Sequence, residues 1–132
     1  MSAEVEVARQ WIQKARNDLL NADNNLAAEE THFDTICFHC QQVAEKVLKG
    51  FLTGKGLVAP RTHDLLVLLE GIIEFDPNAE TLRETLIILQ PYAIEVRYPD
   101  GDFTPSSEDA REARDAAGTI LAWLERTFPE VR

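Results

Sequence analysis

Apolar side chains recur at intervals of three and four residues along almost the whole 132-residue chain. This spacing places them on one face of an α-helix, whereas a half-buried strand would alternate apolar and polar residues. No stretch of the chain reads as an alternating strand. The sequence therefore predicts an all-α protein, in which the apolar face of each helix is buried against its neighbours.

Breaks in this periodicity divide the chain into five expected helices. The helices cover residues 3–30, 35–53, 63–75 and 79–97, and a last helix begins after Pro105. Gly54 and Gly56 end the second helix, and 76-DPN-78 forms a turn before the fourth. Four long helices and one shorter one, joined by short loops, predict an antiparallel up-and-down four-helix bundle with an additional short helix.

Three positions predict local detail in this bundle. Thr62 is expected to cap the third helix, with Asp64 in the first turn, where its charge is favourable. Ser106 or Ser107 is expected to cap the last helix. Pro91 lies inside the fourth helix, where it should produce a kink or remove one backbone hydrogen bond.

Length and apolar content set the broad class of the protein. A chain of 132 residues fits one domain spanning residues 1–132. No apolar run approaches the roughly 18 residues that a transmembrane helix needs, so no membrane association is expected. The acidic start, MSAEVEVARQW, lacks the apolar segment of a signal peptide. These features predict a cytoplasmic protein.

The net charge of −10 restricts the ligands that the protein can bind. Non-specific binding to DNA, RNA or anionic lipid needs many Lys and Arg side chains to neutralise phosphates. The charge therefore disfavours those partners. A small anionic ligand that is held by a few cations stays compatible with it.

The two cysteines form a C-x-x-C pattern, at Cys37 and Cys40. A redox-active pair is expected at a helix N-terminus after a strand, whereas this pair lies inside a helix. A zinc site needs two further ligands, and His32 and His63 are not spaced as a second pair. The sequence therefore predicts buried core cysteines, with no metal site and no cofactor.

One polar stripe on the second helix is a candidate ligand-binding surface. An advance of 100° per residue places Gln42, Lys46 and Lys49 within about 80° of His39. Two lysines on such a stripe favour binding of an anion or a nucleotide phosphate. The alternative interpretation is a helix face that is simply solvated.

His63 and the stretch RYPDGD are further candidates. His63 could orient a phosphate or act as a general base, or it could make only a local hydrogen bond at a helix start. Pro99 forces Tyr98 out of helical geometry, so the fourth helix must end there. Arg97 complements the helix dipole at that end. This explanation leaves the side chains of Tyr98, Asp100 and Asp102 without a role.

Four stretches, taken in order, resemble the HEPN family, whose name stands for higher eukaryotes and prokaryotes nucleotide-binding. They are Trp11 with 15-ARNDLLNA-22, 41-QQVAEKVLKGFL-52, 62-THDLLVLL-69 and 97-RYPD-100. Together they span nearly the whole chain, and the last one is similar to the RYPD-containing subgroup of the family. Each stretch alone is a weak signal, and the ordered set is specific.

The resemblance implies a helical bundle that forms a homodimer and binds a nucleotide such as ATP, GTP or AMP. It also implies action with a separately encoded minimal nucleotidyltransferase, in some members as a toxin–antitoxin pair. The chain has no Gly-Ser of the kind that those transferases carry, so a partner would perform any transfer. The candidate nucleotide-binding residues are Arg97, Tyr98, Asp100, Lys46, Lys49, Gln42, His39 and His63.

A ribonuclease is the main alternative function, because some HEPN proteins cleave RNA with an Arg and a following His. Arg97 matches the Arg, but the positions where the family places the His hold Asp102, Phe103 and Thr104. A ribonuclease would have to use Asp102 or His63 to move the proton. No catalytic residue is therefore assigned. A non-catalytic helical adaptor is the third hypothesis.

Overall fold

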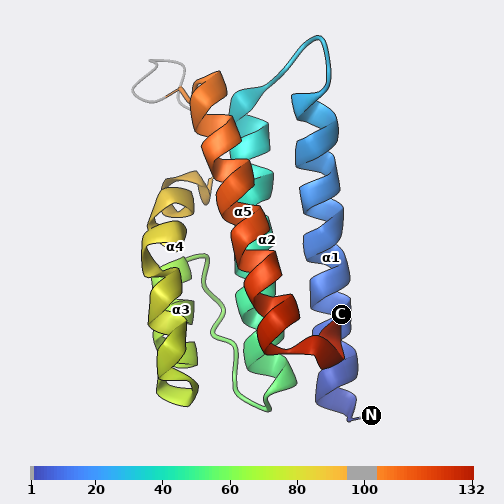
Figure 1. The fold of residues 1–132 in the computed structure, drawn as a ribbon, viewed down its shortest axis with the longest axis vertical. Helices are drawn as coiled ribbons and strands as arrows, with labels where there is room; N and C mark the ends of the chain where they lie inside the picture. Colours follow the sequence, from blue (N-terminus) through green and yellow to red (C-terminus); the bar gives the residue numbers. More distant parts are fainter. Residues whose placement is uncertain (1, 95–103) are drawn as a thin grey trace.

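The computed structural model describes residues 2–94 and 104–132. Within these ranges the chain is helical and contains no strand, which confirms the all-α prediction (Figure 1). The α-helices are α1 (Ala3–Leu26), α2 (Phe33–Gly54), α3 (Leu65–Phe75), α4 (Arg83–Leu89) and α5 (Ser107–Thr127). Three short 3-10 turns accompany them: η1 (Pro77–Leu82), η2 (Gln90–Tyr92) and η3 (Pro129–Val131).

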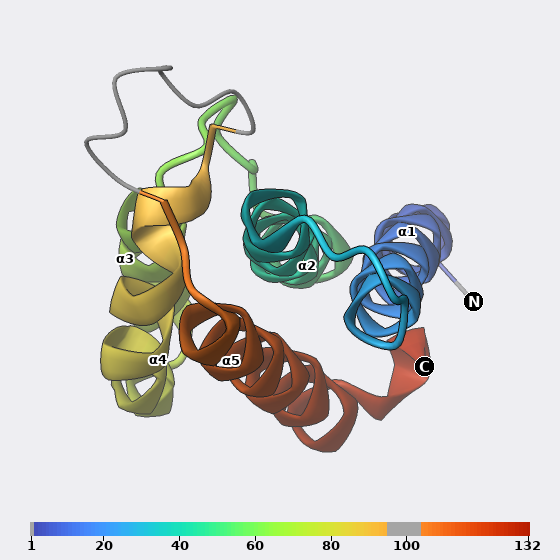
Figure 2. The same ribbon diagram turned by 90° about the horizontal axis from the view of Figure 1, so that it is seen from above.

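Helix α2 is the centre of the bundle. It packs against α1 on one side, α3 on the other and α5 along its length (Figure 2). Helices α1 and α4 run in one direction, and α2, α3 and α5 run in the other (Figure 1). The loop of residues 55–64 runs back along the bundle after α2, so α3 has the same direction as α2. This return is the one place where the up-and-down alternation is interrupted.

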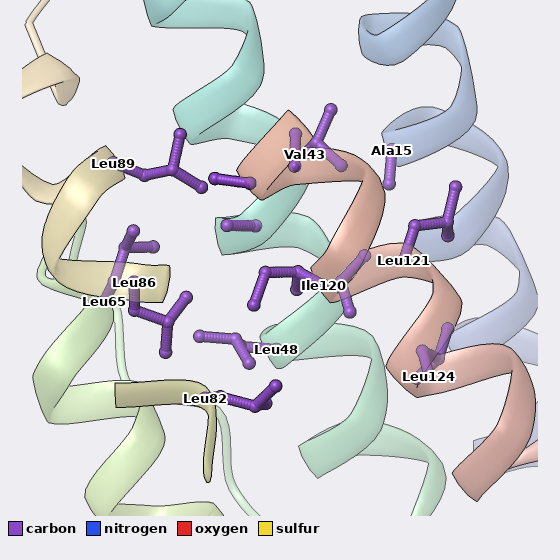
Figure 3. Close-up of a cluster of buried hydrophobic side chains, with 14 of the residues drawn as sticks. Ala15, Val43, Leu48, Leu65, Leu82, Leu86, Leu89, Ile120, Leu121 and Leu124 are labelled. Carbon is purple, nitrogen blue, oxygen red and sulfur yellow. The ribbon is translucent and has the colours of Figure 1, made fainter. Parts of the chain in front are cut away.

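The core is formed by apolar side chains from all five helices (Figure 3). On α2, the predicted apolar positions Ile36, Cys40, Val43 and Val47 are all fully buried. Burying a side chain of this kind contributes roughly 1.5–3 kcal/mol relative to leaving it exposed. The long apolar face of α2 therefore explains why the other helices gather around it.

The two cysteines belong to this core, as the sequence predicts. Cys37 and Cys40 are buried free thiols. Burial, together with the neighbouring Cys37, raises the pKa of the Cys40 thiol to about 12. Because only the thiolate is a good nucleophile, Cys40 is inert at neutral pH.

The predicted start of the third helix is wrong by two residues. Asp64, not Thr62, caps α3, and its Oδ1 accepts hydrogen bonds from the backbone N–H of Leu66 and Val67 at 3.0 and 3.3 Å. Thr62 instead accepts a bond from the Asp64 N–H at 3.1 Å and shapes the turn before the helix. Both residue types cap helices, and the tertiary course of the loop decides between them.

The predicted fourth helix, residues 79–97, is the largest departure within the described part of the chain. It is divided into η1, α4 and η2, and the α-helical part ends at Leu89. Pro91 lacks a backbone N–H and its ring clashes with the preceding turn, so the chain tightens into η2 at that point. Residues 95–97 of the predicted segment lie outside the described residues.

The remaining helix boundaries differ less from the prediction. The first helix ends at Leu26 rather than at residue 30, and α2 extends the predicted 35–53 by a few residues. Ser106 caps α5, and it forms a capping box in which the Asp109 side chain accepts from the Ser106 N–H at 2.9 Å. Ser106 is one of the two serines that the sequence offers for this cap. No helix in the described ranges is long and apolar enough to cross a membrane.

Glycines allow close contact where α1 and the C-terminal residues meet α2. A Cβ atom at Gly54 would lie 2.6 Å from Cε2 of Phe128 and 3.0 Å from Cβ of Ala8. A Cβ atom at Gly50 would lie 3.1 Å from Cβ of Trp11. No side chain fits at Gly54 without movement of the Phe128 ring.

Gly54→Ala is expected to lower the free energy of unfolding by about 1–3 kcal/mol, because the added methyl group overpacks this contact. The matched control is Gly71→Ala inside α3, where the nearest atom to a new Cβ is Cδ2 of Leu52 at 3.6 Å. Higher helix propensity should leave that variant unchanged or more stable by up to about 1 kcal/mol. Urea denaturation measures both, and a Gly54→Ala protein as stable as wild type would contradict the close packing.

Candidate functional site

The candidate site is centred on a buried carboxylate in the middle of α2. Glu45 is only 4% exposed. Its Oε1 atom lies 2.8 Å from Nδ1 of His63, and its Oε2 accepts a hydrogen bond from Nζ of Lys49 at 3.0 Å. Weaker bonds to Oε1 come from the amides of Gln41 and Gln42, at 3.4 and 3.5 Å. A charge removed from water needs such partners, and Glu45 has four.

Three of the four partners come from the same helix. Gln41, Glu45 and Lys49 follow one another at intervals of four residues, so they line one edge of α2. Gln41 is fully buried. Its Oε1 atom accepts a hydrogen bond from the side-chain amide of Gln42 at 2.7 Å. The local sequence of α2 therefore builds most of the site.

The fourth partner, His63, is brought by the loop that returns along α2. The Gln41 amide donates to the backbone carbonyl of His63 at 3.1 Å, which ties the loop to the helix. The next residue, Asp64, accepts a bond from Nε2 of Gln90 at 2.7 Å, and Oε1 of Gln90 accepts from the Leu65 N–H at 2.9 Å. His63 is thus held from both sides, by α2 and by η2.

The negative charge of Glu45 determines which ring nitrogen of His63 carries a proton. Burial raises the pKa of Glu45, but the hydrogen bonds from His63 and Lys49 lower it by more, so its pKa lies below the ordinary value of 4.5. Glu45 is therefore ionised at neutral pH, and an ionised carboxylate can only accept hydrogen bonds. Nδ1 of His63 must carry the proton that is shared with Glu45.

This arrangement leaves the other nitrogen of His63, Nε2, free for chemistry. The His63 side chain is 72% exposed, although its partner carboxylate is buried. In the neutral ring Nε2 can accept a proton, and in the protonated ring it presents a positive N–H to an anion. A fixed and accessible imidazole is the group of this site that is best suited to accept a proton or to bind an anion.

A second carboxylate belongs to α1 and lies where α1 contacts α2. Asp18 of α1 is 9% exposed. It forms an ion pair with Lys46, and its Oδ1 lies 3.3 Å from Nδ1 of His39. Lys46 and His39 are therefore directed toward α1 and help to hold it against α2.

The structure divides the predicted polar stripe between these two carboxylates. His39 and Lys46 meet at Asp18, whereas Gln42 and Lys49 meet at Glu45, which also contacts His63, a separate candidate outside the stripe. Both lysines are engaged in ion pairs and are mostly covered, with side-chain exposures of 22% for Lys46 and 12% for Lys49. Arg97, Tyr98 and Asp100, the other predicted residues, lie outside the described residues.

Sequence reasoning missed three residues of the site: Asp18, Gln41 and Glu45. Asp18 stands three residues after Ala15 and four before Ala22, both fully buried, so it occupies a core position of the apolar pattern. A charged side chain at a core position is a usable signal, because it has to be paired. Across the described ranges, no group of three or more His, Cys, Asp or Glu side chains is placed to hold a metal ion.

Glu45→Gln is expected to lower the free energy of unfolding at pH 7 by about 1–3 kcal/mol, because the charged bonds to His63 and Lys49 are weakened. The control is Glu74→Gln, which changes an exposed carboxylate of α3 and should cost under about 0.5 kcal/mol. Urea denaturation compares the two variants with the wild type.

The pH dependence of this difference follows from the lowered pKa of Glu45. The stabilisation is fully present above the unfolded pKa and is lost as the pH falls through the lower, folded pKa. Stability should therefore fall more steeply with acidification in the wild type than in Glu45→Gln, and the two curves should converge. Parallel curves down to about pH 3 would contradict the role of Glu45.

Comparison with protein-family models places both carboxylate clusters inside one matched region. The model of the HEPN domain matches residues 8–127. Comparisons with curated proteins and with solved structures give no match. The family match covers most of the 132 residues and agrees with the all-α bundle. The chain belongs to the HEPN domain family.

Proposed function

We propose that the protein is a nucleotide-binding HEPN domain and that His63 contacts a phosphate of the bound nucleotide. The observation that carries this proposal is the 2.8 Å contact between Glu45 Oε1 and His63 Nδ1, which fixes the imidazole with Nε2 toward solvent. HEPN domains commonly bind nucleotides or RNA. A small nucleotide fits the net charge of −10 better than a long RNA does.

The balance of charges around the site supports an anionic ligand. Lys46 and Lys49 offset Asp18 and Glu45, so the two clusters are locally close to neutral although the whole protein is acidic. Protonation of His63 then gives this face a net positive charge. In this proposal the lysines, His39 and Gln42 keep the carboxylates from repelling a phosphate, and of the side chains in the two clusters only His63 bonds to it directly.

The stretch of Arg97, Tyr98 and Asp100 is included in the proposal on the basis of its place in the chain. It follows shortly after Gln90, which is hydrogen-bonded to Asp64 beside His63. An arginine suits a phosphate because its guanidinium donates two parallel hydrogen bonds. Similarity to RYPD-containing members of the family supports the same assignment.

We further infer a dimeric, cytoplasmic, single-domain protein that acts with a minimal nucleotidyltransferase, as a toxin–antitoxin component in the family's manner. HEPN domains commonly dimerise, which supports the first part. The absence of a Gly-Ser from the sequence supports a separate chain as the transferase. In such a pair this protein supplies the nucleotide-binding surface and the partner supplies the transfer chemistry.

Ribonuclease activity is the second candidate, and the Glu45–His63 pair is the observation that favours it. In that reaction Nε2 of His63 would take the proton of an RNA 2′-hydroxyl. The 2′ oxygen would then bond to phosphorus as the bond to the 5′ oxygen breaks. The leaving 5′ oxygen would need a proton from a second group.

Calorimetric titration with ATP, GTP and AMP tests the proposal. Wild-type protein should bind at least one of them saturably, and His63→Gln should weaken binding by about tenfold or more, because a charge-assisted hydrogen bond is lost. His32→Gln is the matched control, since His32 precedes α2 and makes no side-chain cap bond there. Arg97→Ala tests the remaining stretch.

Equal affinity in the wild type and in His63→Gln would remove His63 from the site, and unchanged binding in Arg97→Ala would remove Arg97. Single-stranded RNA added to the same preparations separates the two candidate functions. Cleavage by the wild type that is lost in His63→Gln would establish the ribonuclease instead.

A further inference from the structure

A hollow of about 220 Å³ lies along α1, and no part of the site described above uses it. Val7, Gln10, Trp11 and Lys14 line it. These residues follow the helical spacing of three and four, so they share one flank of α1, beside the face on which Ala8, Ile12 and Ala15 are fully buried. Val7 is 43% exposed, and Gln10 and Lys14 are exposed as well.

The hollow is connected to the Glu45 cluster through one lysine. Nζ of Lys49 lies 5.9 Å from the centre of the Trp11 ring and 3.0 Å from Oε2 of Glu45. On its other oxygen, Glu45 contacts His63 at 2.8 Å. A Cβ atom at Gly50 would lie 3.1 Å from Cβ of Trp11, so Trp11 lies close to α2. Trp11 and His63 are thus the two ends of one short chain of contacts.

The chemistry of the hollow suits a flat, nitrogen-rich ring that is joined to a negatively charged group. An indole face stacks on any nucleobase, and such stacking is worth about 1–3 kcal/mol. Gln10 has an amide that donates and accepts, and it makes no side-chain hydrogen bond to another described residue. Lys14 makes no ion pair within the described part of the chain. The charged side chain that lines the hollow, Lys14, is cationic.

We propose that this hollow is the base-binding subsite for a nucleoside 5′-phosphate. The base stacks on Trp11, Gln10 hydrogen-bonds to its edge, and the sugar and phosphate extend past Lys49 toward His63. Lys14 adds a positive charge at the rim. This inference rests on the proposed function, because it concerns the same ligand: its phosphate lies at His63 and its base lies at Trp11.

The fluorescence of Trp11 tests the subsite directly. The chain contains two tryptophans, and Trp123 is 6% exposed and packed against Phe51 at a ring-centre distance of 5.1 Å. Trp123→Phe therefore leaves Trp11 as the only indole. AMP or ATP should quench its emission saturably, whereas inorganic tripolyphosphate, which has no base, should not. If Trp123→Phe fails to fold, the indole N–H signal of Trp11 in the NMR spectrum of the natural chain provides the same readout.

A substitution at Trp11 provides the second arm of the test. Trp11→Leu should weaken ATP binding about tenfold or more, since the stacking energy is lost, and should leave tripolyphosphate binding unchanged. Leu20→Ala, which changes an apolar side chain of α1 that is 59% exposed, is the matched control and should change neither.

Three results would overturn the subsite, and they separate it from the proposed function. Calorimetric binding of a nucleotide with no change at Trp11 and no effect of Trp11→Leu would remove the subsite and leave the proposed function standing. Absence of binding by every nucleotide would remove both. A Trp11→Leu protein that changes from dimer to monomer with unaltered nucleotide affinity would identify the hollow as an interface between copies.

Discussion

The negative charge of Glu45 is the constraint on which the rest of the site depends. At 4% exposure the carboxylate cannot rely on water, so the bundle has to supply its partners. The amides of α2 and Lys49 lie close by in the sequence, but His63 reaches Glu45 only because residues 55–64 run back along α2 (Figure 1). Packing and electrostatics thus fix the same loop, and removal of the charge should affect stability and ligand contact together.

The second carboxylate, Asp18, holds α1 against α2, just as Glu45 holds the returning loop against α2. Its ion pair with Lys46 and its contact with His39 join the polar faces of α1 and α2. The positive charges of Lys46 and Lys49 offset the negative charges of Asp18 and Glu45. This face is therefore close to neutral, although the protein carries a net charge of −10.

Apolar periodicity predicts α2 and α5 well, because their core faces are regular and because Ser106 and Asp109 form a recognisable capping box. It predicts the fourth helix poorly, since the pattern continues through Pro91 although the backbone cannot. The candidate site was predictable only in part. A helical wheel places Lys49 on a polar stripe, but it does not reveal which loop returns to meet Glu45. Asp18 at a core position was the one local signal of a buried ion pair.

The most direct test of the central role of Glu45 is the tautomer of His63, measured by long-range ¹⁵N–¹H NMR at a pH where the ring is neutral. The account predicts a proton on Nδ1 and none on Nε2, because Nδ1 donates to the ionised Glu45. In Glu45→Gln the population should move toward the Nε2–H form that a free imidazole prefers. A wild-type ring that carries its proton on Nε2, with no response to Glu45→Gln, would contradict the account.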